Sequence, residues 1–220
     1  MTPRKIYDQE LALLRDSLED MANMVEASLN NLFFAIENKD NELAKQIIKD
    51  DHNINNMERS IESQCLSLIT KQQPIAGDLR IVSSILKVVT DVERIGDHAS
   101  DIAELILRLN NAQLETYSAH LQPMITAAKE MVHDAVSAFI NRDRDHSAEV
   151  IESDDVVDEL FNKVKTDIAN RLRTENGDVD ECIDVLMIAK YLERIGDHAV
   201  NICEWEIFKE TGSIENTLVY

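Results

Sequence analysis

The sequence predicts an all-α protein made of two tandem antiparallel three-helix bundles related by internal duplication. Turn-forming and aromatic residues are scarce, with five Gly and three Pro in 220 residues and an aromatic share of 5%. This composition disfavours a many-stranded sheet. Apolar residues also recur at helical intervals, and one motif occurs twice, 100 residues apart. Together these observations favour helices arranged in two copies.

The duplication is visible in the run ERIGDHA, at residues 93–99 and again at 193–199. Upstream, Met21 and Asp51 match Met124 and Asp154 with a shift of 103. The change of shift means that a loop of the second copy has lost three residues. We therefore expect two domains, a first bundle at 1–111 and a second at 112–220.

In the first half we expect helices at 6–38, 41–71 and 76–109. The first of these carries a stripe of period near 3.6, which predicts a face directed at the core: Leu11, Leu14, Leu18, Met21, Val25 and Leu29. Helix-breaking residues separate the three segments, at 38–40, at 72–77 with Pro74, and at Asn110-Asn111.

In the second half we expect helices at 119–141, 144–173 and 179–209. The breaks fall at Arg142-Asp143 and at Glu175-Asn176-Gly177. Connections this short make neighbouring helices antiparallel. Each half should therefore fold as a three-helix bundle.

The net charge of −20 limits the partners that this chain can have. It would repel nucleic acid and anionic lipid but attract divalent cations and basic protein surfaces. The start MTPRKIYDQELALLRDSLED lacks a signal-peptide core, and no stretch approaches the ~18 apolar residues of a membrane span. Three unclustered cysteines, Cys65, Cys182 and Cys203, suit reduced thiols. We expect a cytoplasmic protein.

Acidic side chains recur at every fourth residue around the repeated motif. Glu93, Asp97 and Asp101 form one row, and Glu193, Asp197 and Asn201 form the equivalent row in the second copy. Residues four apart share a helix face, so each row aligns oxygen donors of like charge. Such a row destabilises a helix unless a metal ion or a basic side chain lies over it.

Antiparallel pairing places a second set of donors opposite each row, since residues facing each other across a turn have numbers of constant sum. Asp51 then faces Asp97, and Asn55 faces Glu93, both centred on Pro74. The second copy repeats the arrangement, with its pairs centred between 175 and 176: Asp154 with Asp197, and Asp158 with Glu193. Each half should bring three or four oxygen ligands between two helices.

Further donors are weaker candidates. The first helix of the second half offers Glu130, His133 and Asp134, while His98 and His198 point about 100° away from the neighbouring Asp and suit orienting or capping roles better than ligation. Carboxylates with an occasional imidazole suit Fe, Zn, Mn, Ni or Mg, singly or as clusters of several ions, whereas calcium would need a loop of oxygen donors that this sequence lacks.

Two other interpretations of these rows stay open. Arg94 and Arg194 could build a salt-bridge lattice without metal, although one Arg per row leaves several carboxylates unneutralised. Gly96 and Gly196 lie inside helices, where glycine costs about 1 kcal/mol relative to alanine. They either give room beside the ligands or allow close helix packing.

With ERIGDHA present twice and QQPIAGDLR at 72–80, the sequence resembles the PhoU family over nearly its whole length. The resemblance implies two similar three-helix bundles with multinuclear metal clusters on E(D)xxxD motifs. It places ligands at Glu93, Asp97 and Asp101, and at Glu193, Asp197 and Glu204. Asn55 and Asn201 depart from the acids often found there, which makes the two sites unequal.

The resemblance also implies a role in phosphate signalling. The family restrains high-affinity phosphate uptake and the phosphate-responsive two-component system, so the expected partners are the ABC-transporter ATPase and the sensor histidine kinase. A homodimer is expected as well. No Gly-rich phosphate loop or nucleophile elbow is present, so we expect a regulator and not an enzyme. The alternatives are a metal-dependent hydrolase or oxidase and a metal-free helical scaffold.

Overall fold

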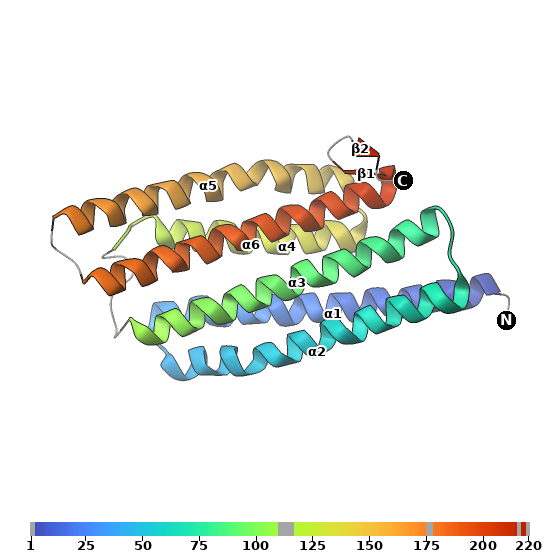
Figure 1. The fold of residues 1–220 in the computed structure, drawn as a ribbon, viewed down its shortest axis with the longest axis horizontal. Helices are drawn as coiled ribbons and strands as arrows, with labels where there is room; N and C mark the ends of the chain where they lie inside the picture. Colours follow the sequence, from blue (N-terminus) through green and yellow to red (C-terminus); the bar gives the residue numbers. More distant parts are fainter. Residues whose placement is uncertain (1–2, 110–116, 175–177, 215–216, 219–220) are drawn as a thin grey trace.

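The computed structural model describes residues 3–109, 117–174, 178–214 and 217–218, and it confirms the predicted fold class. Two antiparallel three-helix bundles lie side by side, with α3 and α6 adjacent at their junction (Figure 1). The first bundle consists of α1 (Pro3–Asn38), α2 (Asn41–Gln72) and α3 (Gly77–Arg108). The second consists of α4 (Leu121–Asn141), α5 (Arg144–Arg173) and α6 (Val179–Thr211). After α6, β1 (Ser213–Ile214) pairs antiparallel with β2 (Thr217–Leu218).

Two of the predicted breaks, at 38–40 and at 142–143, supply helix caps. Asp40 accepts hydrogen bonds from the amides of Glu42 and Leu43 at the start of α2, and Asp143 caps α5 in the same way. Such caps satisfy amides that lack a partner within the helix. The predicted turns at 110–111 and 175–177, and the domain boundary between 111 and 112, lie outside the described residues.

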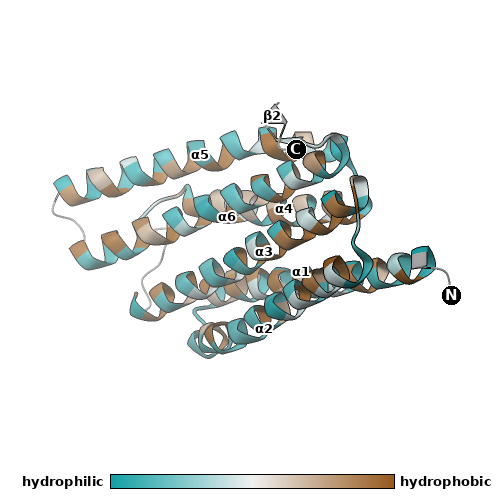
Figure 2. Cartoon of the chain, turned by 45° about the vertical axis from the view of Figure 1, so that its right-hand side comes forward, coloured by the Kyte–Doolittle hydropathy of each residue, from teal (hydrophilic) through white to brown (hydrophobic). Residues whose placement is uncertain are grey.

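The core runs through both bundles and their junction. The predicted stripe on α1 is buried throughout, with Leu14, Met21 and Leu29 at most 1% exposed. Hydrophilic and hydrophobic stretches follow one another along the helices in view, such as α5 and α6, as the period of an amphipathic helix predicts (Figure 2). The thiols of Cys65, Cys182 and Cys203 are buried and unpaired, in agreement with the sequence. None of the described helices is long and apolar enough to span a membrane.

Candidate metal centre

The first acidic site lies between α2 and α3. Asp51 on α2 lies near the carboxylates of Asp97 and Asp101 on α3, as the pairing across the turn predicts for Asp51 and Asp97. Burial raises the pKa of Asp51, and the nearby charge of Asp97 raises it further. The Asn55 amide donates a 3.1 Å hydrogen bond to Asp51 Oδ2. Two helices therefore gather oxygen donors in a partly buried space.

Several of these donors are buried without a hydrogen-bond partner. They are Asp51 Oδ1, Asn55 Oδ1 and Glu93 Oε2. Arg94 compensates only part of the charge, because its Nη1 lies 2.6 Å from Asp97 Oδ2 while its Nε stays 3.4 Å from Glu93 Oε2. Buried polar atoms normally have partners, so these three oxygens identify a place where a cation would be stabilised.

Glu93 is the most perturbed acid of this site. Glu93 is only 7% exposed. This burial, followed by the charges of Asp97 and Glu58, raises its pKa from 4.5 to about 7. Glu58 was not among the predicted site residues, and burial raises its pKa as well. The constant sum of residue numbers across the turn could have identified Glu58, since 58 and 90 centre on Pro74 and the Glu58 side chain forms a hydrogen bond with that of Thr90.

The second acidic site lies between α5 and α6. Burial, then the charges of Asp158 and Asp197, raise the pKa of Asp154 from 3.8 to about 6, and Asp154 Oδ1 is buried without a partner. Lys190 pairs with Glu193. Asp158 and Asp197 are exposed, so this site is more open to solvent than the first.

The two motif glycines have different surroundings. A Cβ added at Gly196 would lie 3.0 Å from Asp154 Oδ1, so this glycine makes room for the candidate ligand. A Cβ at Gly96 would instead lie 3.0 Å from Ile54 Cδ1, a core side chain. Both roles left open by the sequence therefore occur, one in each copy.

The histidines of the motif meet at the junction of the bundles. The rings of His98 and His198 have centroids 5.5 Å apart, and His198 Nδ1 lies 2.8 Å from Asp91 Oδ1. Asn201, a predicted ligand, donates to the same Asp91 oxygen at 3.1 Å. Its amide is thus directed at the first bundle. Sequence periodicity could not identify this contact, because it joins the two halves.

Asp101 and Glu204 lie at the margins of the predicted sites. Asp101 Oδ2 is 3.6 Å from His98 Nδ1, and its charge also raises the pKa of Asp51, so it stands between the first site and the junction. Glu204 is half-buried on α6, seven residues beyond Asp197.

The candidates on α4 face α1. His133 Nδ1 lies 3.1 Å from Glu26 Oε1, and Asp134 approaches His146 of α5 at 3.7 Å. Together with Glu130 they line a hollow of about 190 Å³ between α1 and α4. The structure therefore places these α4 candidates beside α1, in a hollow distinct from the two acidic sites.

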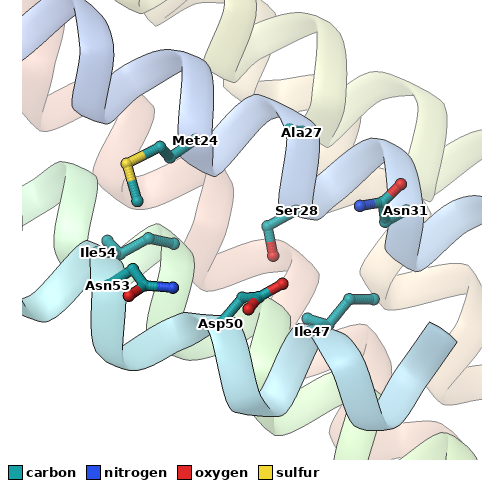
Figure 3. Close-up of a pocket in the computed structure, with 8 residues that line it drawn as sticks. All are labelled: Met24, Ala27, Ser28, Asn31, Ile47, Asp50, Asn53 and Ile54. Carbon is teal, nitrogen blue, oxygen red and sulfur yellow. The ribbon is translucent and has the colours of Figure 1, made fainter. Parts of the chain in front are cut away.

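A second hollow, of about 280 Å³, lies between α1 and α2. Figure 3 shows Ser28 and Asp50 pointing toward one another across it, with Met24 and Ile54 beside them. None of the candidate donors of the first acidic site lines this hollow.

The donor atoms of each site are of the kind that a divalent cation accepts, but the described side chains are not arranged around one point. In the described part of the chain, no three His, Cys, Asp or Glu side chains converge closely enough to hold one ion as they stand. Asp97 turns toward Arg94, and Glu193 toward Lys190. The buried, unpartnered oxygens are nevertheless the hard donors that Mg, Mn, Fe and Zn accept in carboxylate sites.

Comparison with known proteins identifies the fold and its motifs. The PhoU domain model matches residues 18–106 and 121–205, one match in each bundle. The chain belongs to the PhoU family. The resemblance stated from the sequence is thereby confirmed, and the two PhoU matches each contain one copy of ERIGDHA.

Relatives span almost the whole chain. A phosphate-specific transport system accessory protein PhoU homolog from Clostridium acetobutylicum is 38% identical, covering 95% of this chain and 96% of its own. The accessory protein PhoU of Escherichia coli is 32% identical, covering 94% and 86%. The crystal structure of the phosphate transport system regulatory protein PhoU from Streptococcus pneumoniae superposes with a TM-score of 0.89 at 29% identity, covering 96% and 100%.

Proposed function

We propose that this protein is a non-enzymatic regulator that restrains high-affinity phosphate uptake and phosphate two-component signalling through protein contacts. Membership of the PhoU family supports this role, since the relatives are named as accessory or regulatory proteins of phosphate transport. The partners are the ATPase of the phosphate transporter and the phosphate sensor kinase. The protein acts in the cytoplasm as a homodimer, with the two bundles, 1–111 and 112–220, as its domains.

Metal ions bound by the two acidic sites are part of the proposal. The observation that carries it is the set of buried oxygens without a hydrogen-bond partner on Asp51, Asn55, Glu93 and Asp154. Of these, the Glu93 oxygen has a counterion, the Arg94 guanidinium at 3.4 Å. In the first site, Glu93 and Asp97 of α3 would hold an ion together with the donors of α2. In the second site, Asp154 of α5 and Asp197 of α6 would hold an ion together with neighbouring donors on the same helices. A bound cation would supply the positive charge that these carboxylates lack, which would fix the spacing of α2 from α3 and of α5 from α6.

Metal analysis tests the sites. We expect stoichiometric Fe, Zn, Mn, Ni or Mg in protein purified without chelator, and its loss in the double variant Asp97→Ala/Asp197→Ala. The control variant Asp50→Ala/Glu152→Ala removes two exposed acids from α2 and α5 and should keep the metal. Equal trace metal in all three proteins would favour the metal-free scaffold.

Partner binding tests the regulatory role. We expect the transporter ATPase and the cytoplasmic part of the sensor kinase to bind the metal-loaded protein more tightly than the metal-free protein in calorimetry. The rival function is a hydrolase or oxidase that uses carboxylate-bound metal. Steady turnover of a phosphate ester that disappears in Asp97→Ala/Asp197→Ala would establish that rival instead.

A further inference from the structure

The turn between α2 and α3 has an unfavourable backbone. Gln73 has φ 45° and ψ 56°, the ordinary left-handed conformation at a helix end. Ala76 has φ 50° and ψ −120°, a region that strongly favours glycine. By contrast, Arg142, at the turn before α5, stays in the left-handed helical region. The backbone strain of this turn therefore lies at Ala76.

The start of α3 also lacks the usual cap. Asp residues cap α2, α5 and α6 with their side chains, whereas Ala76 precedes α3 and makes no side-chain cap. The turn is closed by a 3.2 Å hydrogen bond from the Asp78 amide to the Ile75 carbonyl. The chain thus forgoes a stabilising cap at this position.

Side chains of α1 hold the turn in place. Tyr7, only 5% exposed, donates a 3.0 Å hydrogen bond to the Asp78 carbonyl. Arg4 pairs with the Asp78 carboxylate, and Gln72 Nε2 donates to Glu10 Oε2 at 3.1 Å. The strained turn is therefore tied to the first helix, next to which it lies in Figure 1.

This fixed turn presents apolar side chains to solvent. Ile75, between the two positive-φ residues, is 78% exposed, the largest fraction among the large apolar side chains that the structure describes. Leu79 on α3 and Leu66 on α2 are also exposed. Strain held in a rigid turn, with its central apolar side chain in water, is characteristic of a preorganised recognition element.

The charge around the turn differs from that of the rest of the chain. The residues at this end of the bundle, 3–10 and 66–80, carry four basic and three acidic side chains: Arg4, Lys5, Lys71 and Arg80 against Asp8, Glu10 and Asp78. The whole chain has a net charge of −20. Lys71, at the end of α2 beside the turn, is exposed, whereas the Arg80 side chain lies against Gly212 after α6. Lys71 is therefore the basic side chain through which the turn complements an acidic surface.

We propose that the α2–α3 turn is a docking knob that inserts Ile75 into an apolar, acid-rimmed socket on the ATPase of the phosphate transporter. This inference rests on the proposed regulatory function and adds the surface through which the partner is bound. A pre-shaped turn loses little conformational entropy on binding, which offsets the cost of its strain. A single central apolar anchor is also typical of protein interfaces.

The test compares Ile75→Ser with Ile183→Ser, which removes another exposed apolar side chain from α6 of the second bundle. The probes are the transporter ATPase and the cytoplasmic part of the sensor kinase, measured by calorimetry with the full-length protein. We expect Ile75→Ser to weaken binding of the ATPase about tenfold or more and Ile183→Ser to leave it unchanged. Lys71→Glu should also weaken binding. Because Ile75 is exposed, melting temperatures should not change.

Each other outcome has a distinct meaning. Equal affinity of wild type and Ile75→Ser for the ATPase, or binding of the sensor kinase alone, overturns the knob and leaves the regulatory function standing. Failure of the wild type to bind either probe overturns the regulatory function, and the knob with it. Wild-type binding to vesicles that contain anionic lipid, lost in Ile75→Ser while probe binding persists, overturns the protein socket in favour of a membrane surface.

Discussion

The two bundles share their helices and acidic spacing, yet they differ in how charges are buried. At the position of Ile106 and Leu109 in the first bundle, the second bundle carries Glu206 and Lys209. Glu206 is fully buried, and Lys209 pairs with it and donates to the Phe139 carbonyl at 3.3 Å. The duplicated pattern therefore fixes the architecture, while substitutions within it change the local electrostatics.

The acidic sites differ in the same way. The first has the amide of Asn55, where the second has the carboxylate of Asp158. In the first site the acid whose pKa is raised most is Glu93 on α3, whereas in the second site it is Asp154 on α5. The same motif in two copies thus produces a closed site and a more open one.

The largest expected effect tests the buried pair. Glu206→Ala should lower the free energy of unfolding by about 3–5 kcal/mol, because it leaves the Lys209 charge buried without its partner. The double variant Glu206→Ile/Lys209→Leu copies the first bundle and should be neutral or stabilising by about 1–4 kcal/mol. Urea denaturation measures both. If the double variant is as unstable as Glu206→Ala, the Glu206–Lys209 pair does more for stability than neutralise its own two charges.

The pH dependence of stability separates the two sites. Glu93 and Asp154 have folded-state pKa values of about 7 and about 6, above their ordinary values of 4.5 and 3.8. The folded state then binds more protons than the unfolded state between those values, so stability of metal-free protein falls as pH rises through this range. Urea midpoints from pH 5 to 8, measured with chelator present, should show the decline.

Single variants assign the pH effect. Glu93→Gln should remove the part of the decline that extends to about pH 7, and Asp154→Asn the part that ends near pH 6. Adding a divalent cation at pH 8 should restore stability in the wild type. A wild-type midpoint that rises with pH over this range would contradict the assignment.

Exchanging the amide and the carboxylate should exchange the properties of the sites. Asn55→Asp adds a charged ligand to the first site and should raise its metal affinity about tenfold, while Asp158→Asn should lower that of the second. Competition with a metal-binding dye measures each affinity. Unchanged affinity in both variants would remove Asn55 and Asp158 from the set of ligands.

The two glycines should respond differently to the same change. Gly196→Ala should displace the Asp154 carboxylate and weaken metal binding at the second site, because the new Cβ meets Asp154 Oδ1. Gly96→Ala should instead cost about 1 kcal/mol of stability through crowding against Ile54, with metal retained. Metal content and urea denaturation of both variants decide whether this difference is real.

The smallest expected effect concerns the strained turn of the first bundle. Ala76→Gly should raise stability by about 1 kcal/mol, since the relief of an unfavourable backbone exceeds the added freedom of the unfolded chain. For a protein of this size that corresponds to about 2–4 °C in melting temperature. A lower melting temperature would mean that the Ala76 methyl group packs more favourably than its backbone strain costs.

The sequence by itself determined the helices, their duplication and the facing of the acidic rows. Spacing of apolar residues and of turn formers is local information, and the constant sum across a short turn follows from antiparallel packing. The pairing of Asp51 with Asp97 followed from this rule, and the same rule would have given Glu58 opposite Thr90.

Only the tertiary structure decided what lies beside each identical motif. ERIGDHA is the same in both copies, yet Gly96 packs on Ile54 and Gly196 on Asp154. The tertiary structure also directs His98, His198 and Asn201 to the junction of the bundles, because contacts between α3 and α6 depend on how the two folded bundles pack. A helical period specifies which residues share a face, but the neighbour of that face is set by packing between distant segments.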